Sequence, residues 1–290
     1  MRARDYPGSD ITIEQRLTPG SNYQRTIASY QSDGLKIYAL MTVPDGDVPA
    51  TGWPVIVFNH GYIPPNQYRT TERYIAYQDA LARAGYITFK SDYRGNGDSE
   101  GTPSGHFGPG YTMDVLNAVG SLKKYPDADA NRIGMWGHSL GGEIALRAMV
   151  VSQDITAGVI WAGTVAPPGE QLGMWGGGSP GAGFHGAPSA PRELTEQYGT
   201  PDENPEFWAS LAATSYLADL SGPIQLHHGE ADEEVPLSFS QALYDAVSQV
   251  GRVVELYTYP GSDHNISQGF DLAMQRTIAF FDRYTKGDGS

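Results

Sequence analysis

Residues 133–142 contain the part of the sequence that decides the fold, and they read Ile133-Gly134-Met135-Trp136-Gly137-His138-Ser139-Leu140-Gly141-Gly142. The first half has the apolar character of a buried strand, and residues 140–151 are rich in Ala and Leu and have helical periodicity. A Gly-x-Ser-x-Gly sequence between a strand and a helix predicts a sharp turn that presents the serine hydroxyl. Gly137 and Gly141 provide the space that this turn requires. The stretch therefore predicts a nucleophile at Ser139.

A second match to the same pattern lies at Gly177-Gly178-Ser179-Pro180-Gly181. No strand leads into this match, and Pro180 lacks the backbone N–H that would be needed to stabilise an oxyanion. Because the pattern arises easily in a glycine-rich chain, the flanking strand and helix are the part that carries information. Ser139 is the preferred nucleophile, and Ser179 is not.

A nucleophilic serine needs a base, and the base needs an acid to orient it. Where the serine lies on a strand-to-helix turn, the acid and then the histidine follow it along the chain. The histidines after Ser139 are His185, His227, His228 and His264. His264 follows the last apolar strand, residues 253–259, and parallel sheets carry their chemistry at the carboxyl ends of their strands. His227 and His228 lie within a strand, so we expect at least one of them to be buried structure. We predict that His264 is the base.

The acid is expected in the loop after the preceding strand, Gly229-Glu230-Ala231-Asp232-Glu233-Glu234-Val235-Pro236. Four carboxylates compete for the role there. We favour Asp232 and interpret Glu230, Glu233 and Glu234 as solvated charges. Spacing alone does not separate Asp232 from Glu233.

Acyl transfer also needs N–H donors for the oxyanion that develops on the substrate carbonyl. One donor is expected from the residue after the nucleophile, Leu140. The second is expected in the loop Phe58-Asn59-His60-Gly61-Tyr62, which follows the first parallel strand. Gly61 allows the backbone to bend closely there, so the N–H of Tyr62 is the candidate. His60 is interpreted as a structural residue that braces the loop.

The pattern along the chain predicts an α/β fold. Residues 25–31 and 36–43 alternate with period two around a Ser-Asp-Gly turn, which indicates a hairpin over residues 25–43. Apolar strands are expected at 55–59, 87–92, 132–138, 158–162, 224–228 and 253–259, and helices at 70–84, 113–124, 140–151, 238–250 and 269–284. This alternation predicts a mostly parallel sheet of about eight strands flanked by helices, within a single domain over residues 1–290.

One segment departs from this alternation of strands and helices. Residues 163–216 are rich in Gly and Pro and contain several large aromatic side chains. Because long insertions in compact domains often carry function, we predict a cap over the site. The candidate substrate contacts in this cap are Trp175, Phe184 and His185.

Composition narrows the classes of partner. Lys and Arg number 19 against 33 Asp and Glu, a net charge of −14, which argues against binding nucleic acid or anionic membranes. There is no cysteine, and no His-Glu-x-x-His motif is present, so we expect no metal and no other cofactor. No apolar run approaches the length of a membrane span, and the first ten residues lack the apolar core of an intact signal peptide. A soluble protein is expected, cytoplasmic or secreted with its signal absent from this chain, while oligomeric state stays open.

Four stretches resemble the α/β-hydrolase superfamily, in particular the catalytic domain of prolyl-oligopeptidase-type (S9-like) peptidases and related esterases. Residues 59–62 are similar to the His-Gly-x oxyanion loop, residues 92–101 to the Asp-x-Arg-Gly-x-Gly-x-Ser-x-Gly loop, residues 137–142 to the nucleophile turn, and residues 228–236 to His-Gly-x-x-Asp-x-x-Val-Pro. The resemblance extends from about Ala39 to Tyr284. It implies the α/β-hydrolase fold and a Ser139–His264–Asp232 triad without a cofactor, with Asp232 rather than Glu233 as the acid.

The substrate class remains divided between two readings. Peptidases of this type carry a β-propeller before the catalytic domain, and too few residues precede the first matched strand for one, whereas stand-alone domains of this type are often carboxylesterases. We therefore favour a carboxylic ester, including feruloyl or acetyl esters, as the small-molecule substrate. The alternative is a serine peptidase that acts on short peptides or aminoacyl amides. A non-catalytic binding protein is a third reading, which the complete triad disfavours.

Overall fold

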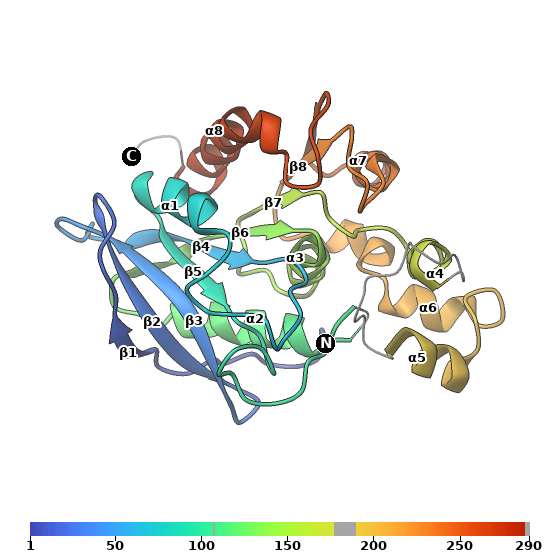
Figure 1. The fold of residues 1–290 in the computed structure, drawn as a ribbon, viewed down its shortest axis with the longest axis horizontal. Coiled ribbons are helices and arrows are strands. Elements are labelled where there is room, and N and C mark those ends of the chain that lie inside the picture. Colours follow the sequence, from blue (N-terminus) through green and yellow to red (C-terminus); the bar gives the residue numbers. More distant parts are fainter. Residues whose placement is uncertain (107, 177–189, 288–290) are drawn as a thin grey trace.

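A single mixed β-sheet organises the computed structural model, which describes residues 1–106, 108–176 and 190–287 (Figure 1). Its strands are β1 (Thr12–Arg16), β2 (Tyr23–Ser32), β3 (Leu35–Pro44), β4 (Trp53–Asn59), β5 (Ile87–Ser91), β6 (Ala128–His138), β7 (Ala157–Trp161), β8 (Ile224–Gly229) and β9 (Val254–Tyr259). They lie in the order β1-β2-β3-β5-β4-β6-β7-β8-β9. The pairs β1–β2, β2–β3 and β3–β5 are antiparallel, and every later pair is parallel. The mostly parallel sheet of an α/β-hydrolase is thereby confirmed.

The sheet in the described residues has nine strands, one more than the sequence indicated. The additional strand is β1 at the edge, and all five of its residues are exposed. A strand without a buried face has no hydrophobic alternation, so the sequence pattern could not reveal it. Only pairing with the neighbouring strand β2 defines it.

The β2–β3 hairpin turns at Asp33 and Gly34, which have φ values of 56° and 79°. Positive φ at both central residues is the geometry of a type I′ turn, whose twist matches that of the strands it joins. The Asp-Gly pair in the sequence supplies residues that tolerate this conformation.

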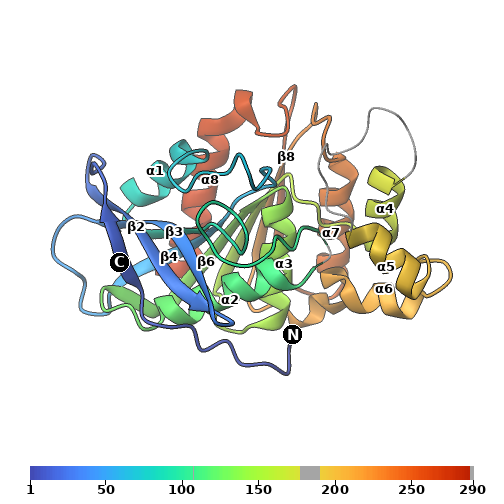
Figure 2. The same cartoon turned by 60° about the horizontal axis from the view of Figure 1, so that its bottom comes forward.

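Helices cover the sheet on both faces (Figure 2). The α-helices are α1 (Ile75–Arg83), α2 (Gly110–Leu122), α3 (Leu140–Val151), α4 (Pro168–Gly176), α5 (Ala190–Tyr198), α6 (Pro205–Leu211), α7 (Leu237–Gln249) and α8 (Phe270–Phe281), with 3-10 helices η1 (Ala213–Asp219) and η2 (Ser267–Gly269) and a π-helical turn η3 (Asp282–Lys286). Buried side chains of α2, α3 and α7 belong to one hydrophobic cluster, and those of α1 and α8 to a second one. Among the described residues, no helix has both the length and the apolarity needed to cross a membrane.

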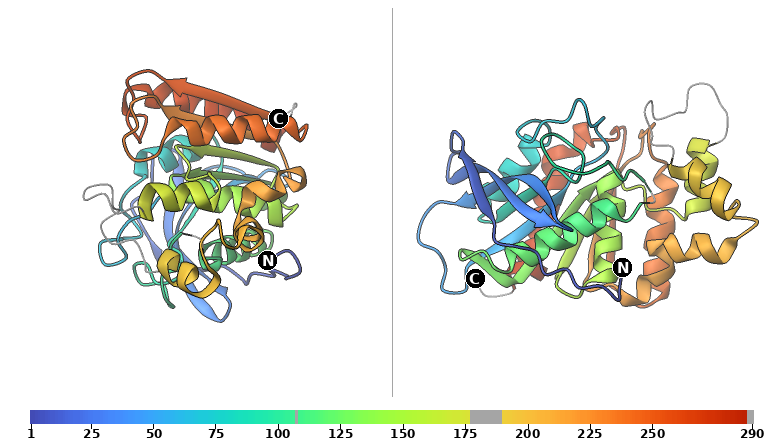
Figure 3. Two further views of the ribbon diagram at one scale, coloured as in Figure 1. Left: turned by 90° about the vertical axis from the view of Figure 1, so that its right-hand side faces the viewer. Right: turned by 90° about the horizontal axis from the view of Figure 1, so that it is seen from below.

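The segment predicted as a cap, residues 163–216, contains α4, α5, α6 and most of η1. Figures 1 and 2 place α4, α5 and α6 together beyond α3 and α7, and the right panel of Figure 3 shows the same group set apart from the sheet. Strands β1, β2 and β3 lie at the opposite end of the molecule (Figure 1). The role of the segment as a cap stays a prediction.

Strand β6 lies in the middle of the sheet, between β4 and β7. Its Trp136 is fully buried and stacks on Phe58 of β4, with ring centroids 4.2 Å apart and planes inclined by 18°. Because β4, β6, β8 and β9 run parallel, the loops that follow them emerge at the same edge of the sheet. All the candidate site loops follow these strands.

Candidate active site

Ser139 occupies a sharp turn between β6 and α3. Its backbone has φ 56° and ψ −122°, a conformation that residues other than glycine rarely adopt. A Cβ added at Gly137 would overlap the backbone of Gly141, and one added at Gly141 would overlap the backbone of Asn59. The two glycines are therefore required by close backbone approach, as the sequence pattern predicted. Ser139 exposes 4% of its surface.

The turn is fixed by backbone hydrogen bonds from the neighbouring strand and loop. The N–H of Ser139 donates to the carbonyl of Trp161 at 3.0 Å. The Ser139 carbonyl accepts from Gly142 N–H at 2.9 Å and from Thr164 N–H at 3.1 Å. A strained residue persists only where its surroundings over-determine it, and these bonds provide that restraint.

Asp232 and His264 are brought together from the loops after β8 and β9. The Nδ1–H of His264 donates to Oδ2 of Asp232 at 2.8 Å. Oδ1 of the same carboxylate accepts the N–H groups of Glu234 at 2.8 Å and Val235 at 2.9 Å. This geometry fixes the orientation of the His264 ring and leaves its Nε2 free of the proton, as a general base requires.

Asp232 has a second histidine partner that sequence reasoning did not identify. His228, fully buried in β8, places its Nε2 3.1 Å from Oδ2 of Asp232 and 2.9 Å from the carbonyl of Val235. Its Nδ1 lies 2.7 Å from the hydroxyl of Ser240. The signals in the sequence that point to this contact are the spacing of four residues and the presence of both residues in the His-Gly-x-x-Asp-x-x-Val-Pro stretch.

The protonation state of Asp232 follows from these partners. Burial alone would raise the pKa of its carboxyl, but the hydrogen bonds from His228 and His264 outweigh burial and hold the pKa well below its ordinary value. The carboxylate is therefore ionised throughout the neutral range. The competing Glu230 accepts instead from the hydroxyl of Thr258 at 2.8 Å.

The loop after β4 lies directly against the nucleophile. A Cβ built on Gly61 would lie 3.2 Å from Cβ of Ser139. The buried His60 bonds through Nδ1 to the carbonyl of Gly61 at 2.7 Å and stacks between Tyr68 and Tyr93, with ring centroids 4.6 and 4.3 Å away. These contacts fit the bracing role predicted for His60.

The two N–H groups predicted to hold the oxyanion come from Tyr62 and Leu140. Leu140 is the first residue of α3, so its N–H has no partner within the helix. Tyr62 directly follows Gly61, the residue that approaches Ser139. Their role as donors stays a prediction.

Within the described part of the chain, no hydrogen bond joins the Ser139 hydroxyl to His264. The nucleophile turn and the His264 loop are nevertheless in contact, because the ring of His138, which precedes the serine, lies 4.6 Å from the ring of His264, centroid to centroid. Catalytic hydrogen bonds are often long before substrate binds and tighten in the Michaelis complex.

The substrate contacts predicted in the cap cannot be placed. Phe184 and His185 lie outside the described residues, and Trp175 falls within α4 at a position whose side chain lies outside the description. Their contribution stays a prediction.

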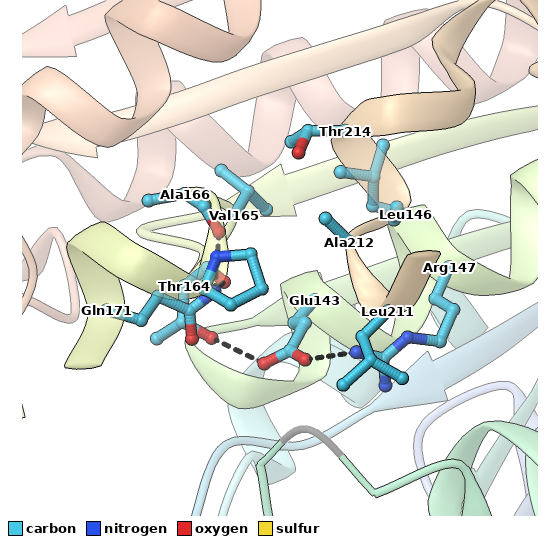
Figure 4. Close-up of a pocket in the computed structure, with 12 residues that line it drawn as sticks. Glu143, Leu146, Arg147, Thr164, Val165, Ala166, Gln171, Leu211, Ala212 and Thr214 are labelled. Carbon is cyan, nitrogen blue, oxygen red and sulfur yellow. Dashed lines mark hydrogen bonds and ion pairs between the residues drawn. The ribbon is translucent and has the colours of Figure 1, made fainter. Parts of the chain in front are cut away.

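Beside α3, a cavity of about 10 Å³, enough for about one water molecule, is lined by residues that include Glu143, Arg147, Thr164 and Gln171. Figure 4 shows the carboxylate of Glu143 between Thr164 and Arg147, with the Arg147 Nη2 at 2.6 Å. Burial would raise the pKa of Glu143, but the Arg147 charge and His106 lower it below its ordinary value. Glu143 is therefore a charge already neutralised within the fold, and not a site for a cationic substrate group.

Together, the fold and these contacts define an α/β-hydrolase with candidate serine, aspartate and histidine residues on loops at one edge of the sheet. A model of the X-Pro dipeptidyl-peptidase (S15) family matches residues 33–182, and a model of the prolyl oligopeptidase family matches residues 184–288. The first match alone covers more than half of the chain. The protein belongs to the S15 and S9 group of α/β-hydrolase families.

Curated relatives include the uncharacterized peptidases YuxL and YtmA of Bacillus subtilis, each 23% identical, over 244 and 258 residues. The matches cover 81% of this chain and 34% of YuxL, and 88% of this chain and 92% of YtmA. A probable dipeptidyl-aminopeptidase B of Aspergillus oryzae is 25% identical over 89% of this chain and 29% of its own length. The chain spans 34% and 57% of the first two curated relatives it matches.

Solved structures with the same fold include peptidases and esterases. An acylaminoacyl peptidase of Pyrococcus horikoshii is 23% identical, with a TM-score of 0.73 over 93% of this chain and 43% of its own. The protein Est1E of Butyrivibrio proteoclasticus, solved with ferulic acid bound, is 22% identical, with a TM-score of 0.67 over 87% of this chain and 96% of its own.

Acid unfolding is a first testable consequence of the burial around this site. Burial lowers the pKa of His60, of His138 and of His227 to about 3, whereas the pKa of an unfolded histidine is about 6.5. Between these values the unfolded chain binds protons that the native state does not, so stability falls as pH falls. Burial raises the pKa of Asp92 to about 6, so near pH 5 the native state holds a proton on this carboxyl that the unfolded chain lacks. This bound proton offsets about one of the protons that the histidines take up on unfolding.

Urea unfolding between about pH 4.5 and 5.5 is expected to show an uptake of about two protons. His227→Gln is expected to reduce this uptake by about one, because one neutral buried imidazole is then missing. An unfolding free energy that is independent of pH over this range would contradict the neutral, buried state of these histidines.

Proposed function

We propose that the protein is a serine peptidase that hydrolyses amide bonds in short peptides or aminoacyl amides, with Ser139 as nucleophile, His264 as base and Asp232 as acid. The observation that carries this proposal is that both family models matched along the chain, over residues 33–182 and 184–288, are named for peptidases. The names of three curated relatives, YuxL, YtmA and the dipeptidyl-aminopeptidase B, support the same substrate class. The preference for an ester, drawn from the sequence, is therefore reversed.

The proposed reaction has two steps. In the first, Oγ of Ser139 attacks the substrate carbonyl while Nε2 of His264 accepts the hydroxyl proton. The N–H groups of Leu140 and Tyr62 bind the oxyanion that forms. His264 then donates that proton to the departing amine. In the second step, water attacks the acyl-enzyme with the same base. Asp232 holds the imidazole in one tautomer and stabilises the imidazolium that forms.

The geometry of His264 supports an amide substrate. An amine is a poor leaving group until it is protonated, so the acid must be held in place as the bond breaks. Asp232 is itself fixed by two backbone N–H groups and by two histidines, which restrains the ring that it orients.

The site also favours a small substrate. Ser139 and His264 expose only 4% and 6% of their surfaces, so a substrate must present a slender segment to reach them. Short peptides and aminoacyl amides meet this condition.

Carboxylic-ester hydrolysis is the second candidate. The observation in its favour is the length match to Est1E, which this chain covers over 96% of that protein, and to the Pyrococcus furiosus esterase Pf2001, which it covers over 99%. The same triad chemistry cleaves esters with less demand on leaving-group protonation.

A paired assay distinguishes the two candidates. Amino-acid, X-Pro and N-acylaminoacyl groups would each be presented both as a p-nitroanilide and as an ethyl ester, so that the acyl part is matched. We expect turnover of at least one anilide, absent in the Ser139→Ala variant. Turnover of esters alone across the whole panel would overturn the peptidase proposal and support the esterase candidate.

A further inference from the structure

The hydroxyl of Tyr74 joins two loops of the candidate site. It accepts the N–H of Gly61 at 3.0 Å, in the loop after β4, and lies 2.7 Å from Nδ1 of His138, in the nucleophile turn. Neither contact was visible in the sequence, because Tyr74 lies in the segment before α1.

The imidazole of His138 extends this connection to the catalytic histidine. Its Nε2 lies 3.0 Å from the carbonyl oxygen of His264, which can only accept, so Nε2 carries the proton. The ring is buried, and its burial together with the nearby His264 lowers its pKa to about 3, so it is neutral and Nδ1 is an acceptor. The hydroxyl of Tyr74 therefore donates to Nδ1. Three hydrogen bonds run in one direction from Gly61 through Tyr74 and His138 to His264.

The backbone that presents Tyr74 is held in a disfavoured conformation. Arg73 and Tyr74 have φ values of 59° and 56°, in the left-handed region that bulky residues avoid. Residues kept in such regions cluster at functional sites and persist only when the surroundings hold them. The strain is an observation independent of the hydrogen bonds.

Buried groups at the end of β5 supply that restraint. The fully buried Lys90 donates through Nζ to the carbonyls of Glu72 at 2.8 Å and Arg73 at 3.3 Å. The buried Asp92 accepts from the hydroxyl of Tyr68 at 2.8 Å and also from that of Thr70. The segment from residue 68 to residue 74 is thus anchored at both ends.

The aromatic ring of Tyr74 is fixed as well. It packs against Phe58 and Trp136, with ring centroids 5.6 and 6.2 Å away, and both of these rings are fully buried. Ring packing and backbone restraint together leave the hydroxyl one place, between Gly61 and His138.

We propose that Tyr74 and His138 form a positioning pair that sets the spacing between the oxyanion loop and the loop that carries His264. This inference rests on the proposed function of the site, but it holds for an amide or an ester substrate. The N–H of Gly61 is committed to Tyr74, so the tyrosine hydroxyl fixes the backbone directly before Tyr62, the predicted oxyanion donor. Misplacement of reacting groups by about 1 Å can cost about 100-fold in rate.

The primary test is Tyr74→Phe, with Tyr86→Phe as the matched control. Each substitution removes a tyrosine hydroxyl that takes part in a 2.7 Å hydrogen bond. The Tyr86 hydroxyl donates to Asp282, and Tyr86 precedes the start of β5, away from the site loops. Tyr74→Phe is expected to lower kcat about 10- to 100-fold, with KM changed less than about threefold. Tyr86→Phe is expected to leave both constants within about twofold, because it touches nothing in the site.

A boronic acid supplies a readout that a merely structural role would not move. Phenylboronic acid adds to a catalytic serine and places a boronate oxygen where the oxyanion would lie. Its Ki is expected to rise in Tyr74→Phe by a factor similar to the fall in kcat, while KM for substrate stays nearly constant. Equal kcat and Ki in Tyr74→Phe and wild type would overturn the proposal.

His138→Asn provides the second arm, because it removes the other member of the pair. Losses in the Tyr74→Phe/His138→Asn double variant are expected to be much smaller than the product of the single losses, since both disrupt one chain of hydrogen bonds. Full multiplicative losses would contradict a shared role. Wild-type protein that turns over none of the substrates would count against the proposed function instead, so the two failures are distinguishable.

Discussion

Ser139→Ala is expected to lower kcat by about 10⁴- to 10⁶-fold on any substrate that the wild-type protein turns over. The reason is that Ser139 is the serine at the sharp turn between β6 and α3, with its Cβ directly against the Gly61 loop. Without Oγ no acyl-enzyme can form, and only binding and the oxyanion donors remain to accelerate the reaction. Initial rates at saturating substrate measure this effect.

Ser179→Ala is the matched control, because Ser179 lies in the other Gly-x-Ser-x-Gly match of the chain. It is expected to keep kcat within about twofold of wild type, as a serine outside the machinery should. A Ser139→Ala variant that kept more than about 1% of wild-type kcat would contradict the assignment of the nucleophile, since triad removal costs far more than that.

Asp232→Asn is expected to reduce kcat by about 10⁴-fold. An amide in place of the carboxylate keeps an oxygen for the N–H groups of Glu234 and Val235, and turns its NH₂ toward Nδ1 of His264. The imidazole would then carry its proton on Nε2, where it cannot accept the proton of Ser139. The tautomer is the cause, so the fold should be retained.

Glu233→Gln is the control for this prediction, because Glu233 is the neighbour that spacing could not exclude. It is expected to keep wild-type kcat, while the thermal unfolding midpoint of both variants should stay within a few degrees of wild type. The reverse pattern, with loss of activity in Glu233→Gln alone, would assign the acid to Glu233.

The sheet could be predicted from the sequence where its strands are buried. The apolar runs became β4 to β9, because strands covered on both faces must be apolar throughout. The exposed edge strand β1 was missed for the converse reason. A boundary error at the start of α1 has a specific cause: the helix predicted over residues 70–84 begins only at Ile75. Lys90 holds the preceding residues in a left-handed conformation, and no local pattern encodes that contact.

The candidate site divides in the same way. Residues carried by local motifs, such as Ser139 in its glycine-flanked turn, could be named from the sequence alone. Glu233 and Asp232 could not be separated by spacing, because the hydrogen bond to His264 depends on how two loops meet in space. His228 and Tyr74 were missed because their partners lie on other loops or across a turn. The preference for an ester rested on the few residues before the first matched strand and on the resemblance to stand-alone carboxylesterases, and neither feature reports on the side chains that contact substrate.

The most direct test of the central claim is to label the protein with a fluorophosphonate and locate the adduct by peptide mass spectrometry. The account predicts one phosphonyl group per chain, on the peptide that contains Ser139, formed rapidly in wild type and not in Ser139→Ala. It also predicts much slower labelling in Asp232→Asn, because the base is then in the wrong tautomer. An adduct on Ser179, or no adduct in a folded wild-type protein, would contradict the assignment of this chain as a serine hydrolase that works through Ser139.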